Sequence, residues 1–375
     1  MKTQYALLSV FVFVWFFAGT TLAQQTIIVD LAGTGDYTSI HDAVDNASDG
    51  DTIRVQPDQY AFTADLGQVT VDKELIIIGA GYMPVEEGGT ELIDIAKNGF
   101  FALTGSADGT IIRGFRVQGA SNFLTSESGA SGITIEQNLF ISGDNTIRFE
   151  GNQDTVRHNI FIDGGVGQVR AIGTNTQVTN NIFSELSRSS VNRGFVEIND
   201  GTGVIVAYNL FLNCDMSHSS SGTIESAGSP EVYSNGFIDN SRPYNTDSGT
   251  PFVTNNGFYN SSSHGLNPVE EAPSFQNFDP DNDVLNTENI DDNDFDFTLA
   301  DGSGWIDMGR TGTPYLDEDG SRSDIGVYAG PNPFVGGKGA PSVPVVIEMQ
   351  VSPTTVSPTG TITIQATGRI GDGSN

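Results

Sequence analysis

Short runs that alternate β-branched and polar residues recur along this chain, and six of them end in the same way. Each of the six carries an asparagine followed two residues later by a phenylalanine, as in TVRHNIF and QVTNNIF. Weaker copies at 73–81 and 110–115 extend the series toward the amino terminus. The repeated asparagines are Asn138, Asn159, Asn181, Asn209, Asn235 and Asn256, with steps of 21, 22, 28, 26 and 21 residues.

A repeat of this length, with several short strands and no helical periodicity, predicts an all-β solenoid in which each coil stacks on the last. Equivalent residues then form ladders along the solenoid. We expect the asparagines to occupy a tight turn and to bond their counterparts on neighbouring coils, and the phenylalanines to stack inside. Six hairpins of an ordinary sandwich are the alternative, but hairpins do not need the same amide in each unit.

One short helix is predicted near the amino terminus. Ile40, Ala43, Val44 and Ala47 are spaced to lie on one helical face, and Thr38 or Ser39 can cap it. Such a helix would cover the strand edges and core at the open end of the first coil.

The asparagine ladder and the stretch 33–60 resemble right-handed parallel β-helix proteins of the pectin-lyase-like superfamily. The segments 296–309 and 316–330 resemble the closing segment of many secreted bacterial members, although Trp305 replaces a small residue and no glutamate follows Tyr328. The resemblance covers about residues 26–330. It implies a single-stranded right-handed parallel β-helix and says little about function, because one fold hosts many chemistries.

The chain divides into three parts. Residues 1–23 read as a signal peptide, which predicts a secreted or cell-surface protein, and no later stretch is long and apolar enough to span a membrane. Residues 24–335 are the predicted β-helix, held without internal disulfides because Cys214 is the single cysteine. Residues 336–375 read as a linker and the start of a truncated immunoglobulin-like module.

The net charge of −31 argues against nucleic acid and anionic membranes as partners. Residues 267–324 contain sixteen acidic and two basic residues. This segment is either a solvated acidic loop or a calcium site, for which Asp279, Asp281 and Asp283 are the candidate ligands. It is not an EF-hand, because Val284 and Ile290 replace the glycine and the glutamate of that motif.

By analogy with the superfamily, the strand before each asparagine belongs to a second sheet and the strand after it to a third. The first sheet then contains the segments 146–150, 168–172, 195–199 and 222–226. In the superfamily, the groove over this sheet commonly holds a polysaccharide. Alternation turns one residue of each segment outward. The predicted outward column is Arg148, Arg170, Glu197 and Glu225, flanked by Glu150 and Asn199.

This column has two interpretations. As an active site, Arg170 would be the base of a lyase and Glu197 a carboxylate that holds Ca²⁺ to stabilise the developing charge, or Glu197 with Glu225 or Glu150 would form the carboxyl pair of a glycoside hydrolase. The remaining members would then bind substrate. As a structural feature, the column would be a ladder of cross-strand ion pairs. The candidate substrate-binding residues are Arg148, Glu150, Asn199 and Glu225.

A pectinesterase is disfavoured. The run GNQDTV at 151–156 resembles part of a pectinesterase motif, but the companion motifs are missing, so Gln153 and Asp154 are interpreted as turn residues. Cys214 and His218 are interpreted as parts of a Ser-rich loop.

Two functions remain: an exported protein that binds or processes an extracellular polysaccharide, and a non-catalytic surface or adhesive scaffold with immunoglobulin-like spacers. A polyanionic glycan would need calcium or a local arginine patch to approach so acidic a chain, whereas a neutral glycan would not.

Overall fold

The fold was determined from a computed structural model of the 375-residue chain. The predicted signal peptide and most of the predicted linker lie outside the residues that the structure describes. Those described residues are 24–62, 67–82, 88–94, 99–119, 122–144, 146–165, 167–188, 193–216, 221–291, 295–334, 345–352 and 363–369.

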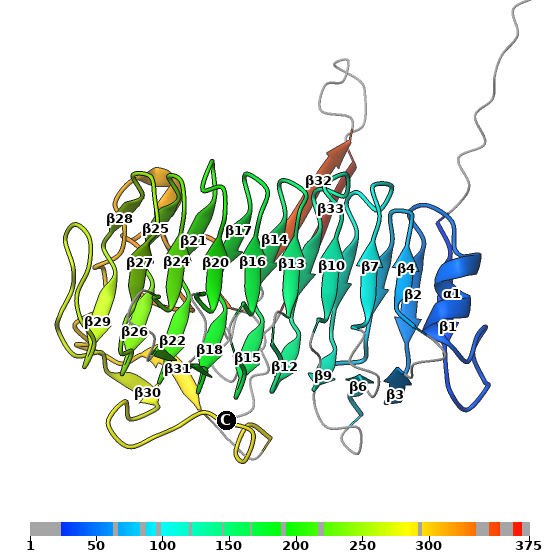
Figure 1. The fold of residues 1–375 in the computed structure, drawn as a ribbon, viewed down its shortest axis with the longest axis horizontal. Helices are drawn as coiled ribbons and strands as arrows, with labels where there is room; N and C mark the ends of the chain where they lie inside the picture. Colours follow the sequence, from blue (N-terminus) through cyan, green and yellow to red (C-terminus); the bar gives the residue numbers. More distant parts are fainter. Residues whose placement is uncertain are drawn as a thin grey trace, which may run out of the picture.

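Most described strands belong to three parallel sheets that run the length of a solenoid, with each coil contributing one strand to each sheet (Figure 1). The second sheet contains β1 (Thr26–Val29), β2 (Thr52–Val55), β5 (Ile76–Ile78), β8 (Ile111–Arg113), β11 (Thr134–Glu136), β14 (Thr155–Arg157), β17 (Gln177–Thr179), β21 (Ile205–Ala207), β25 (Glu231–Tyr233) and β28 (Phe252–Thr254). The third sheet contains β3 (Asp58–Phe62), β6 (Thr90–Asp94), β9 (Arg116–Gln118), β12 (Leu139–Ile141), β15 (Ile160–Ile162), β18 (Ile182–Ser184), β22 (Leu210–Leu212), β26 (Gly236–Ile238) and β29 (Gly257–Tyr259). The first sheet contains β4 (Val69–Val71), β7 (Phe101–Leu103), β10 (Leu124–Ser126), β13 (Ile147–Phe149), β16 (Val169–Ala171), β20 (Val196–Ile198), β24 (Ile224–Ser226) and β27 (Tyr244–Thr246). The predicted parallel β-helix and its assignment of strands to sheets are therefore confirmed.

The asparagine ladder closes the turn between the second and third sheets. All six repeated asparagines are buried, and the side-chain oxygen of each of the last five accepts the backbone N–H of the one before it. Asn181, for example, donates its amide to the carbonyls of Val156 and Thr179 at 2.9 Å. The ladder thus satisfies turn groups that no strand can pair, as predicted.

The phenylalanines that follow the asparagines form the predicted aromatic column inside the coils. Phe161 and Phe183 are stacked with centroids 4.7 Å apart, and Phe183 and Phe211 are separated by the same distance. This spacing equals the roughly 4.8 Å rise between parallel strands, so the rings stack because the backbone ladder sets their separation.

Helix α1 (Ile40–Asn46) covers the amino-terminal end of the coils and packs on β1, β2 and β4 (Figure 1). Ile40, Ala43 and Val44 are its buried residues, as the spacing predicts. Of the two predicted caps, Ser39 is the one that forms: its hydroxyl accepts the backbone N–H of His41 at 3.1 Å.

The segment after the last coil covers the outer face of the third sheet. Strands β30 (Phe275–Asn277) and β31 (Asp296–Leu299) pair antiparallel, and the apolar side chains around them bury the outward residues Leu139, Ile160 and Ile182. Arg116 on β9 binds the Asp291 carboxylate of this segment with contacts of 2.6 and 3.0 Å.

Trp305 explains an irregularity of the repeat. The last two units read NGF where earlier units read NIF or NLF. A Cβ atom at Gly236 would lie 2.4 Å from Trp305 Cζ3, and one at Gly257 would lie 2.6 Å from Trp305 Cε2. The two glycines therefore make room for the buried indole ring on the outside of the third sheet.

Residues 310–329 also cover part of the second sheet. Asn180 donates its side-chain amide to the carbonyls of Val327 and Ala329 at 2.9 Å each. Further toward the last coil, Arg310 lies over the rings of Tyr233 and Tyr315, the latter from the 3-10 helix η2 (Thr313–Tyr315).

The carboxyl-terminal region contributes an antiparallel pair, β32 (Val345–Ser352) and β33 (Thr363–Arg369), where two strands of an immunoglobulin-like module are predicted. Two strands do not establish such a module. No helix in the described part of the chain has the length and apolar content needed to cross a membrane.

Candidate functional site

The predicted outward column forms on the first sheet. Arg148 is the register partner of Arg170, Arg170 of Glu197, and Glu197 of Glu225. The buried residues on either side of each, such as Val169 and Ala171, point into the core. We call Arg148, Arg170, Glu197 and Glu225 the charged column.

The charged column continues toward the amino terminus as a neutral one. Thr125 is the register partner of Arg148, and Ala102 and Thr70 follow on the two preceding strands. All three side chains are at least partly exposed. We call Thr70, Ala102 and Thr125 the neutral column. The first sheet thus retains accessible outward side chains, whereas the outward apolar residues of the third sheet are buried.

The arginines of the charged column are paired with carboxylates. Arg170 Nε and Nη2 lie 2.8 and 3.2 Å from the two carboxylate oxygens of Glu197, and both side chains are about 15% exposed. Arg193 approaches the same carboxylate at 3.9 Å, and Arg148 is ion-paired with Glu150. These contacts engage the guanidinium with a protein carboxylate, and a guanidinium has no acceptor atom, so Arg170 is poorly suited to act as a base.

Glu225 differs from the rest of the charged column because it is only 2% exposed. The expectation that it faces solvent is therefore wrong, although its strand position is as predicted. Burial, followed by the nearby carboxylates of Asp247 and Glu197, raises the pKa of Glu225 to about 7, and the Ser221 hydroxyl offsets part of this effect. Among the described residues, neither of its carboxylate oxygens reaches a hydrogen-bond partner of good geometry. Glu225 is consequently a carboxyl group that can hold or release a proton near neutral pH.

Close backbone packing holds Glu225 in place. A Cβ atom at Gly194 would lie 2.9 Å from Glu225 Cβ, so the absence of a side chain at Gly194 allows the chain to pass over this residue. On the other side, Glu225 is the register partner of Asn245, and Asp247 lies two residues further along that strand direction.

The sequence prediction missed Asp247 and Ser221. Asp247 follows β27 in the segment YNTDS, where Asn245 and Asp247 alternate as Glu197 and Asn199 do two coils earlier. Extending the alternation by one more coil would have found it. Ser221 precedes β24 in a loop, where no periodicity marks it.

The two flanking candidates lie at the edge of the charged column. Glu150 pairs with Arg148, as described above. Asn199 is exposed at the end of β20, and its backbone N–H donates to the Ala171 carbonyl at 2.9 Å.

The two lengthened coils carry an extra strand pair beside the charged column. Strands β19 (Ser187–Arg188) and β23 (Asp215–Met216) pair with each other in the turns that lead from the third sheet to the first. Residues 189–192 and 217–220 of these turns lie outside the described residues.

The aspartates predicted as calcium ligands do not converge. Asp279 accepts the backbone N–H of Asp281, Asp283 accepts that of Asp279, and Asp281 accepts the Tyr259 hydroxyl. Within the described ranges, no three His, Cys, Asp or Glu side chains are grouped so that they could hold a metal ion. In this structure these carboxylates bond to their own loop and to Tyr259. Calcium binding itself stays an untested prediction.

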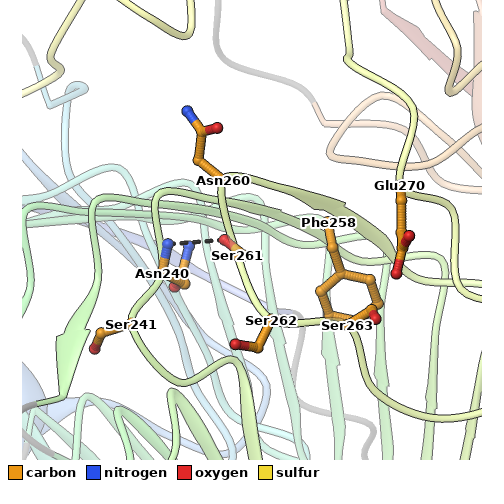
Figure 2. A pocket seen from close by; sticks show the side chains of 8 residues that line it. All are labelled: Asn240, Ser241, Phe258, Asn260, Ser261, Ser262, Ser263 and Glu270. Carbon is orange, nitrogen blue, oxygen red and sulfur yellow. Dashed lines mark hydrogen bonds between the residues drawn. The ribbon is translucent and has the colours of Figure 1, made fainter.

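A polar hollow of about 640 Å³ lies at the last coil (Figure 2). The Oγ of Ser261 accepts the backbone N–H of Asn240 across its floor, and Glu270 is the one ionisable side chain among the residues that line it. A single carboxyl group cannot supply the acid–base pair that glycoside cleavage needs. Its lining residues are Asn240, Ser241, Phe258, Asn260, Ser261, Ser262, Ser263 and Glu270.

Comparison with known proteins finds similarity at the level of structure. No family model matches the sequence, and no curated protein matches it. The structure is similar to that of an alginate lyase from Paenibacillus sp. str. FPU-7, with 15% identity over 66% of this chain and 91% of that one and a TM-score of 0.39. It is also similar to a pectate lyase, with 13% identity over 81% and 96% of the two chains and a TM-score of 0.47.

Proposed function

We propose that this protein is an exported glycoside hydrolase that cleaves an extracellular polysaccharide on the open face of the first sheet. The observation that carries the proposal is Glu225, a buried carboxyl group whose pKa is raised to about 7 beside the carboxylates of Asp247 and Glu197. Export rests on the signal-peptide pattern of residues 1–23.

The chemistry assigns one role to Glu225 and one to a neighbouring carboxylate. Protonated Glu225 gives its proton to the oxygen of the scissile glycosidic bond as that bond breaks. A second carboxylate, Glu197 or Asp247, either takes a proton from the attacking water or attacks the sugar carbon itself. Arg170 holds the Glu197 carboxylate in a fixed orientation through its two contacts. This division of roles replaces the lyase assignment of Arg170 as base.

A structural ladder is the competing interpretation, and the order of charges argues against it. A ladder that only stabilises the sheet would alternate in sign, because like charges directly opposite each other destabilise a strand pair. Here Arg148 is opposite Arg170, and Glu197 is opposite Glu225. The central Arg170–Glu197 pair fits a ladder, but the flanking like-charge pairs do not.

The test compares Glu225→Gln with Glu288→Gln, the same substitution at an exposed glutamate on the segment that covers the third sheet. Turnover of a glycan panel is measured from new reducing ends, and elimination is monitored by absorbance of the new double bond. Glu225→Gln should lower kcat about 10²–10⁴-fold, while Glu288→Gln should not change it. In the wild type, kcat/KM should fall above pH 7 as Glu225 loses its proton.

Melting temperatures give a second test that distinguishes the proposed active site from a non-catalytic scaffold. Because the pKa of Glu225 is raised in the folded protein, this residue destabilises the fold increasingly as pH rises toward and past 7. Glu225→Gln should therefore melt at a higher temperature than the wild type at pH 8. If no glycan is turned over and the two variants behave alike, the protein is a scaffold.

A further inference from the structure

We infer that the open face of the first sheet takes a neutral polysaccharide rather than a polyuronate, with the neutral column of Thr70, Ala102 and Thr125 contacting sugars beside the charged column. This inference rests on the proposed function, because it names the substrate class of the same site.

The cations of the charged column are already matched by carboxylates. Arg170 and Arg193 both approach Glu197, and Arg148 is paired with Glu150. A uronate carboxylate would have to displace one of these protein carboxylates, each of which is held next to its arginine by the backbone. Three arginines face four carboxyl groups here, since Glu225 and Asp247 add to the two paired glutamates.

The neutral column offers no cation either. Thr70 and Thr125 present hydroxyl groups, and Ala102, with its shorter side chain, lies between them in register. Two residues beyond the neutral column, the exposed side chains are Asp72 and Glu127.

Lys73 is the one lysine in the described part of the chain, and it is also engaged. Lys73 Nζ lies 3.2 Å from the Asp72 carboxylate and donates to the Val44 carbonyl at 3.1 Å. The described part of this face therefore repels a chain that carries one negative charge on each sugar. Sugar hydroxyl groups, in contrast, donate well to carboxylates and accept from threonine hydroxyls.

The experiment measures binding and turnover by the full chain. Neutral glucans, mannans and xylans are compared with polygalacturonate and alginate, each with Ca²⁺ and with chelator. We expect a neutral glycan to bind at least tenfold more tightly than either polyuronate in chelator, and its cleavage, not its binding, to be lost in Glu225→Gln.

Two substitutions at Thr125 sharpen the test, with Thr134 as the matched control, since Thr134 occupies an outward position on β11 of the second sheet. Thr125→Tyr should weaken neutral-glycan binding at least tenfold, and Thr125→Arg should strengthen polyuronate binding at least tenfold at low salt. Thr134→Tyr and Thr134→Arg should do neither. Melting temperatures identify any variant that misfolds, and Thr125→Ser then serves as the conservative replacement, for which wild-type binding is expected.

The outcomes separate the two proposals. Tight polyuronate binding in chelator, with cleavage that depends on Glu225, overturns the neutral-glycan inference and leaves the hydrolase proposal standing. Neutral-glycan binding that Thr125→Tyr leaves unchanged also overturns the inference. Failure to bind or cleave any glycan overturns the proposed function, and the inference falls with it.

Discussion

Replacing Gly236 with alanine tests how the carboxyl-terminal segment is locked onto the solenoid. The new Cβ atom would lie 2.4 Å from Trp305 Cζ3 and 2.8 Å from Cη2. The backbone fixes the position of the new Cβ atom, and the ring that it meets is rigid and fully buried. The ring also donates its Nε1–H to the Glu271 carbonyl at 2.9 Å. The indole ring must therefore shift, and such overpacking costs about 1–3 kcal/mol of unfolding free energy.

The control is Gly105→Ala, where the nearest atom to a new Cβ lies 3.4 Å away. This change should be neutral or stabilise by up to about 1 kcal/mol, because alanine lowers the entropy of the unfolded chain. The assay is equilibrium denaturation in urea.

A double-mutant cycle isolates the contact. Trp305→Ala alone should cost about 3–5 kcal/mol through the cavity that it leaves. In that background Gly236→Ala should become neutral, giving a coupling of about 1–3 kcal/mol with Trp305. Equal stabilities for Gly236→Ala and Gly105→Ala in the wild-type background would refute the packing argument.

Two further predictions concern buried polar groups. Asn181→Leu removes five hydrogen bonds of the ladder and should lower the unfolding free energy by about 3–5 kcal/mol. The control Asn46→Leu, at an exposed asparagine, should lower it by no more than about 0.5 kcal/mol. An unchanged denaturation midpoint for Asn181→Leu would contradict the ladder. Asp154 is fully buried, and burial raises its pKa from 3.8 to about 7. Its stabilising contribution is complete below pH 4 and is lost as pH rises to 7, by about 4 kcal/mol at most. Urea titrations from pH 4 to 8 should show that the unfolding free energy of the wild type falls relative to that of Asp154→Asn as pH rises. Parallel pH dependences for the two proteins would exclude this contribution of Asp154.

The features predicted from the sequence are those set by contacts between neighbouring coils. Asn159 bonds Asn181, Phe161 stacks on Phe183, and Arg170 meets Glu197 because each is one coil from its partner. In a solenoid, each coil contacts its neighbours, so aligning the recurring turn motif of successive coils gives their register. This is why strand assignment and the outward column could be predicted without a structure.

The features that were missed depend on contacts across the whole chain. Trp305 packs on Gly236, and Arg116 binds Asp291, 175 positions away. No periodicity links such residues. The burial of Glu225 belongs to the same class, because it depends on what passes over the sheet rather than on the strand itself. The hydrogen bonds of Asp279, Asp281 and Asp283 belong to the same class, since composition shows where acidic residues concentrate and not where their oxygens point.

The positions where the repeat breaks distinguish the site from the fold. The ladder asparagines and stacked phenylalanines recur in six successive units because they close and fill the same turn in each. The glycines at 236 and 257 break the pattern, and Trp305 accounts for them. The two lengthened coils break it as well, and the pairing of β19 with β23 accounts for part of their extra length. The column from Arg148 to Glu225 is a third break, and packing does not account for it, since it places like charges opposite each other and buries one carboxyl group beside two others. A solenoid tolerates such an arrangement at the expense of stability, which is expected where the outward face serves a ligand rather than the fold.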